Sequence, residues 1–152
     1  MAPASTKVQE RSVQVTVVTS GQPTDRRGLA VSTPSAVSAT AYGQGVELLI
    51  GSSAEAVSVL RVAVESDPHF ELARVALACA LAAAGMPEEA LRCDCPPLSC
   101  RACTRRERQH IEVVRLVLSG ERERAAVLGR EHLREFPNDI LVVYTLTSHG
   151  FA

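Results

Sequence analysis

The chain has 152 residues, enough for one domain with a modest core. Its net charge of −1, with few aromatic side chains that could stack on bases, argues against a nucleic-acid binder. Hydrophobic residues make up 46% of the chain but aromatic residues only 3%, so the interior must consist of Ala, Val and Leu, which suits close helix packing.

Residues 1–33 are rich in Ser, Thr, Gln, Pro and charge, and we expect a flexible arm. Alternation at Val13, Val15 and Val17 is compatible with an edge strand, but no second strand is visible nearby. The arm does not resemble a signal peptide, and no apolar segment is long enough to cross a bilayer. We therefore expect a protein of the bacterial cytoplasm without a membrane partner.

The rest of the chain is predicted to form helices that end at glycine or proline residues. The first begins at Pro34, whose missing N–H costs nothing in the first turn, and Thr104 with Glu107 predicts a capping box further on. Paired prolines, Pro96 and Pro97, stop the helix that starts near residue 87. The expected helices are 34–50, 53–66, 69–84, a short one at 87–91, 104–119, 121–136 and 139–149.

These helices recur with a fixed period. Glycines stand 34 and 35 residues apart, an alanine follows each glycine by five residues, and two prolines follow by 17: Gly51, Gly85, Gly120; Ala56, Ala90, Ala125; Pro68, Pro137. Such glycines end a first helix, and such alanines lie where two helices cross. The pattern predicts an all-α fold over 34–150, a short tetratricopeptide-like solenoid of antiparallel hairpins with about six or seven helices.

Three segments carry a narrower likeness: GLAVSTPSAVSATAYGQGVELL, AVESDPHFELARVALACALAAAG and TRRERQHIEVVRLVLSGERERAAVLGREHLREFPND. In order and spacing they resemble the opening repeats of the tetratricopeptide repeat protein 38-like family, from about Arg27 to Tyr144. The resemblance implies an all-helical repeat scaffold and protein binding, without a catalytic site. Members of that family continue for several more repeats, and the cysteine-rich insert at 93–103 is not part of their pattern.

The insert interrupts the middle repeat and holds four cysteines in the form C-x-C-x4-C-x2-C: Cys93, Cys95, Cys100 and Cys103. Four thiolates on a proline-stiffened loop are a ligand set for tetrahedral Zn²⁺, which could replace the missing helix and hold Leu91 and Ile111 together. Surface thiols, or a redox pair of Cys100 and Cys103, are the alternatives. By contrast, Cys79 lies on an apolar helical face and is expected in the core.

Partner binding is expected on the concave side of the array. Its first helices would present Glu107, His110, Val114 and Tyr144 to a peptide or helix of another protein. His110 is also compatible with a metal ligand or with a partly buried structural histidine, and His132 with a packing role.

The sequence therefore favours a non-enzymatic scaffold or adaptor. Alternatives are a zinc- or thiol-dependent regulatory module, an accessory protein of a biosynthetic enzyme, or a fragment of a longer repeat protein. The apolar helix at 139–149 has no successor to pack on, so self-association through it is a further expectation.

Overall fold

The structure is a computed structural model that describes residues 21–93 and 103–150. These residues form seven α-helices and one isolated antiparallel bridge between Thr24 and Ala30, which confirms the all-α prediction. The helices are α1 (Ala36–Ile50), α2 (Ala56–Ser66), α3 (Glu71–Ala83), α4 (Pro87–Arg92), α5 (Arg105–Leu118), α6 (Arg122–Glu135) and α7 (Ile140–Ser148). Within this part of the chain, no helix has the length and apolarity that a membrane crossing requires.

The helix ends follow from local sequence signals. The Thr104 side chain accepts from the Glu107 N–H and the Glu107 carboxylate accepts from the Thr104 N–H, so the predicted capping box is present. Gly85 and Gly120 adopt left-handed backbone angles, with φ of 76° and 79°. At the first repeat the left-handed residue is instead Ser52, with φ of 57°, one position after the glycine.

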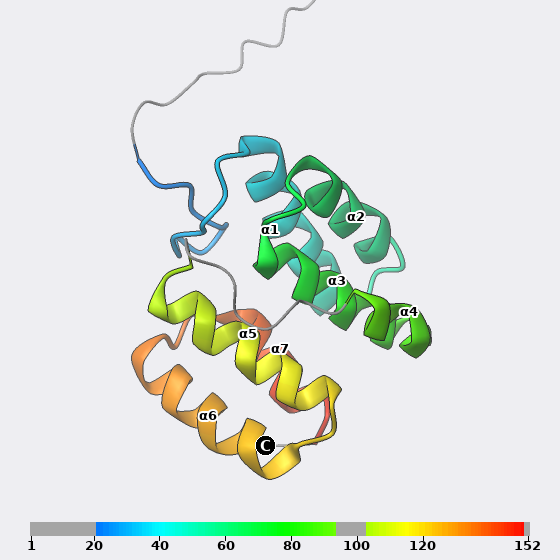
Figure 1. The fold of residues 1–152 in the computed structure, drawn as a ribbon, viewed down its shortest axis with the longest axis vertical. Helices are drawn as coiled ribbons and strands as arrows, with labels where there is room; N and C mark the ends of the chain where they lie inside the picture. The colour runs from blue at the N-terminus through cyan, green and yellow to red at the C-terminus, as the bar shows by residue number, and fades with distance from the viewer. Residues whose placement is uncertain (1–20, 94–102, 151–152) are drawn as a thin grey trace, which may run out of the picture.

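The helices pack as consecutive hairpins around α3. Figure 1 shows α1–α4 as one group and α5–α7 as a second group beside it, with α3 facing α5. Ten of the 13 residues of α3 are buried, most of them alanines and leucines, because this helix is covered by neighbours on several sides. The repeat alanines Ala56, Ala90 and Ala125 are buried where helices meet, as the spacing predicted.

The array does not remain open at its ends. Helix α7 contacts α5 and α6 and reaches α1, so the first and last helices of the described chain touch each other. None of the large exposed hydrophobic side chains of the described residues lies on α7. The expected self-association through this helix therefore stays a prediction, and no exposed apolar face on α7 supports it.

Of the arm predicted at 1–33, residues 1–20 lie outside the described residues, while the described part, residues 21–33, contacts the helices. This segment lies between the N-terminal ends of α1 and α5 (Figure 1), and Val31 is completely buried. The Ser32 N–H and hydroxyl both donate to the Glu107 carboxylate at 2.6 Å, and Arg106 donates to the Ala30 carbonyl at 2.7 Å. Composition does not predict that this segment is ordered, because its hydrogen-bond partners lie about 75 residues further along the chain. The strand considered at Val13–Val17 lies outside the described residues.

Candidate functional site

A buried polar cluster joins α5, α6 and the start of α7. At its centre is Asp139, which precedes α7 and is 3% exposed. Its carboxylate lies 2.7 Å from an Arg106 nitrogen, 2.9 Å from Nδ1 of His110 and 3.0 Å from Nε2 of His132. Three helical elements therefore meet on one carboxylate.

The electrostatics of the cluster favour the ionised form of Asp139. Burial alone would raise its pKa, but the charge and hydrogen bond of His110, the hydrogen bond of His132 and the charge of Arg106 outweigh burial and hold the pKa far below its usual range. Next to it, Glu107 is 1% exposed and uses both oxygens to bind Ser32 and the Thr104 N–H. The cluster thus connects the N-terminal segment to the last helices.

Three members of the cluster carry donor types that bind metals. One atom each of His110, His132 and Asp139 lies within 4.8 Å of the others, and two histidines with a carboxylate are a known zinc ligand set. However, Nδ1 of His110 and Nε2 of His132 already lie at hydrogen-bond distance from the Asp139 carboxylate. The positively charged Arg106 binds the same carboxylate oxygen as His132. This geometry is that of a hydrogen-bonded ion cluster, whose role is to hold the helices together.

The residues expected to line a concave binding face lie mainly in the interior. Glu107, His110 and Val114 are buried, and Tyr144 is half-buried against the main core. His110 contacts Asp139 and His132, and Glu107 binds Ser32 of the 21–33 segment, so these side chains are occupied inside the fold. Three roles are predicted for His110: a partner contact, a metal ligand or a partly buried structural histidine. Its complete burial and its contact with Asp139 favour the structural role.

The predicted metal ligands are only partly within the described residues. Cys95 and Cys100 lie outside them, while Cys93 and Cys103 stand at the two ends of that gap. Cys103 is buried and disulfide-bonded, whereas Cys79 and Cys93 have free thiols. Burial raises the pKa of the Cys93 thiol, so this thiol is not activated as a nucleophile. The four-cysteine zinc site stays a prediction, because Cys95 and Cys100 lie outside the described residues.

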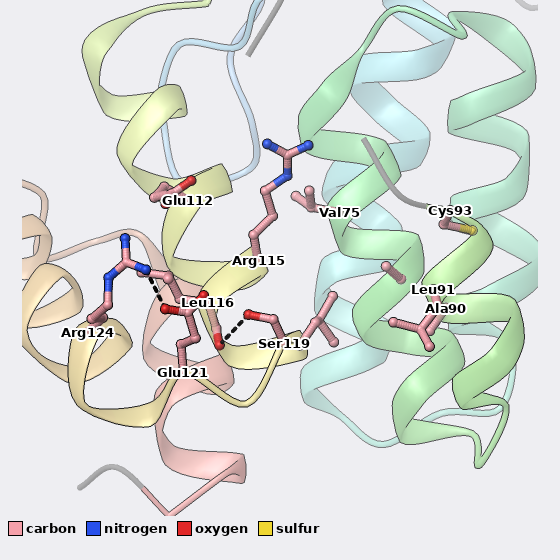
Figure 2. Close-up of a pocket in the computed structure, with 12 residues that line it drawn as sticks. Val75, Ala90, Leu91, Cys93, Glu112, Arg115, Leu116, Ser119, Glu121 and Arg124 are labelled. Atoms are coloured by element: carbon pink, nitrogen blue, oxygen red, sulfur yellow. Dashed lines mark hydrogen bonds and ion pairs between the residues drawn. The ribbon is translucent and has the colours of Figure 1, made fainter. Parts of the chain in front are cut away.

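The middle repeat leaves a cavity where its second helix stops. Helix α4 has only six residues, whereas α2 and α6 have 11 and 14, so among the described residues the middle repeat has a shorter second helix than its neighbours. A cavity of about 360 Å³ lies between α3, α4 and α5, with Val75 and Leu91 on one side and Glu112, Arg115 and Leu116 on the other (Figure 2). Leu91 is 65% exposed here, and its zinc-dependent packing near Ile111 stays a prediction.

A second cavity of about 600 Å³ continues from the first, between α5 and α6. The two cavities share Glu112, Leu116 and Arg124 as lining residues. We call this connected surface the α4–α6 groove. Its apolar lining residues are Val75, Ala78, Ala90, Leu91, Leu116, Leu118, Val127 and Leu128.

None of the residues predicted to bind a partner lines this groove. The signal that could have found it is the break after Leu91, where the 34-residue pattern calls for more helix. The cysteines at that break predict a metal-binding insertion, and the sequence pattern does not indicate the neighbouring groove between α4 and α6.

Comparisons with known proteins do not assign this chain to a family. No family model, curated protein or solved structure matches it. The likeness to tetratricopeptide repeat protein 38-like proteins therefore stays a prediction, and function has to be argued from the surface described above.

Proposed function

We propose that this protein is a protein-interaction module that binds a helix of a partner in the α4–α6 groove. The observation that carries the proposal is the short α4, which ends at Arg92, so that no described residue forms a second helix of full length beside the cavity between α3, α4 and α5. A partner helix laid in the groove would supply that missing layer. This is the helix-in-groove mode of recognition, in which apolar anchors on the helix fill pockets of the receptor.

The exposed side chains at the groove support this choice of surface. Of the four large hydrophobic side chains with high exposure in the described residues, Leu91 and Val127 line the groove, while Val37 and Val62 lie on α1 and α2. Covering an exposed leucine or valine stabilises a complex by about 1.5–3 kcal/mol when burial is complete. The groove thus offers two anchor positions, Leu91 and Val127, that are already exposed, so the protein need not break internal contacts to present them.

Photo-crosslinking in the native cell tests the proposal. A photoreactive phenylalanine derivative replaces Leu91 in one variant, Val127 in a second and Val37 in a third, which serves as the control because its 61% exposure matches that of Leu91. We expect the first two variants to crosslink the same partner and the Val37 variant to miss it. Adding Val127→Ser to the Leu91 variant removes the second apolar anchor without changing the charge of the groove, and it should weaken the crosslink strongly.

The opposite pattern would refute the proposal. Crosslinks that appear equally at Val37, or that persist unchanged with Val127→Ser in place, would mean that the partner does not use the groove. Far-UV circular dichroism of each variant shows whether the helices remain intact, so loss of a crosslink through unfolding is recognised.

A further inference from the structure

The α5–α6 half of the groove combines an apolar floor with acidic edges. Leu116, Val127 and Leu128 form the floor of the 600 Å³ cavity, and three carboxylates surround it, those of Glu112, Glu123 and Glu131. On α6, Glu123, Val127 and Glu131 succeed each other at intervals of four residues and so share one face of the helix. Glu112 and Leu116 have the same spacing on the facing side of α5.

These three carboxylates have no cationic partner within the groove. None of them forms an ion pair in the part of the chain that the structure describes, whereas the lining arginine Arg124 is paired with Glu121 (Figure 2). The α5–α6 half of the groove is lined by these three glutamates and one arginine, Arg124, whereas Arg115 lines only the other half. Uncompensated charges of one sign around an apolar surface attract a partner of the opposite sign and repel one of the same sign.

We infer that the partner segment is a basic amphipathic helix, with aliphatic residues on one face and lysines or arginines along the edges of that face. This inference rests on the proposed function and specifies the chemistry of its partner. The aliphatic face would cover Leu116, Val127 and Leu128, while the long basic side chains lie over the edges of the groove and place their charges at the glutamates. Acidic helices and polyanions such as nucleic acids would be repelled by the same carboxylates.

Two designed peptides test the charge preference directly. The first is an 18-residue amphipathic helix with leucines on one face and lysines at its edges, and the second replaces every lysine with glutamate. Fluorescence anisotropy measures binding of each peptide to the full chain at 50 mM and 300 mM salt. We expect the lysine peptide to bind and to weaken at the higher salt concentration, because exposed ion pairs are screened.

Removing the groove charges identifies the site. Glu112→Gln, Glu123→Gln and Glu131→Gln together should weaken binding of the lysine peptide about tenfold, because its ion pairs with the three carboxylates are lost. The matched control carries Glu55→Gln and Glu65→Gln, two exposed changes at α2, and should bind as the wild type does.

Three results would overturn the inference: equal or tighter binding of the glutamate peptide, unchanged affinity in the triple variant, or no binding of the lysine peptide at 50 mM salt. Crosslinking at Leu91 and Val127 is independent of charge. Positive crosslinks with a failed peptide test would therefore retain the groove and reject only the basic partner.

Discussion

Replacing Asp139 with asparagine should destabilise the protein strongly while changing its shape very little. The asparagine occupies the same volume, but it removes the negative charge that faces Arg106, His110 and His132 in a region with almost no solvent access. Breaking a buried ion pair from one side costs about 3–5 kcal/mol, because the remaining charge stays buried without compensation. That is a large fraction of the roughly 5–15 kcal/mol that holds a typical domain together.

Urea unfolding followed by far-UV circular dichroism at pH 7 measures this loss. The control is Glu123→Gln, which removes an exposed carboxylate with no ion pair in the described structure and should change the free energy of unfolding by less than about 0.5 kcal/mol. A loss below about 1 kcal/mol for Asp139→Asn would refute the claim that this carboxylate holds α5, α6 and α7 together.

The pH dependence gives an independent test with a defined sign. Because the folded-state pKa of Asp139 lies far below its unfolded value of about 3.9, the folded state binds this proton less readily than the unfolded state. The contribution is complete above about pH 5 and is lost as the pH falls below about 4 toward the folded-state pKa. The difference in unfolding free energy between wild type and Asp139→Asn should therefore shrink on acidification, and a difference that grows would contradict the assigned electrostatics.

Three further predictions concern the turns, the N-terminal segment and the thiols. Gly120→Ala should lower the free energy of unfolding by about 1 kcal/mol because its φ is positive, whereas Gly51→Ala, with φ of −74°, should be neutral or slightly stabilising in the same urea titration. Ser32→Ala removes a hydroxyl that donates to the buried Glu107 carboxylate and should lower the free energy of unfolding by about 1.5–3 kcal/mol. Limited proteolysis should then cleave residues 21–33 faster. An unchanged cleavage rate would mean that Val31 alone holds the segment. In native protein, iodoacetamide followed by peptide mass spectrometry should label Cys93 but not Cys79, whose pKa burial raises to about 12; equal labelling would show that α3 opens readily.

Helix positions could be predicted from the sequence because their signals are local. The capping box at Thr104 and Glu107 and the left-handed glycines 85 and 120 require only residues within one or two turns, and all are confirmed. Glu107 shows the limit of such signals. Its role as a cap could be inferred from its neighbour three residues away, but its bonds to Ser32 depend on a contact that only the three-dimensional fold creates.

The candidate site could not be predicted in the same way. Periodicity indicates which helical faces are apolar, but it does not say whether a neighbouring helix covers them. An open array predicts His110 and Val114 in a groove, but His110 packs against Asp139 and His132 and Val114 belongs to the main hydrophobic core. Leu91 is exposed near the end of the short α4, and the periodicity of the sequence gives no sign of that exposure.

The attachment of the 21–33 segment to α5 has a consequence for biosynthesis. Ser32 is translated 75 residues before Glu107, an interval of roughly 4–15 s at ordinary rates of elongation. Throughout that interval the nascent polypeptide has no acceptor for Ser32 and no enclosed place for Val31. The amino-terminal stretch therefore emerges early but reaches its native position late, and it is during this delay that a chaperone or a protease would meet it unfolded.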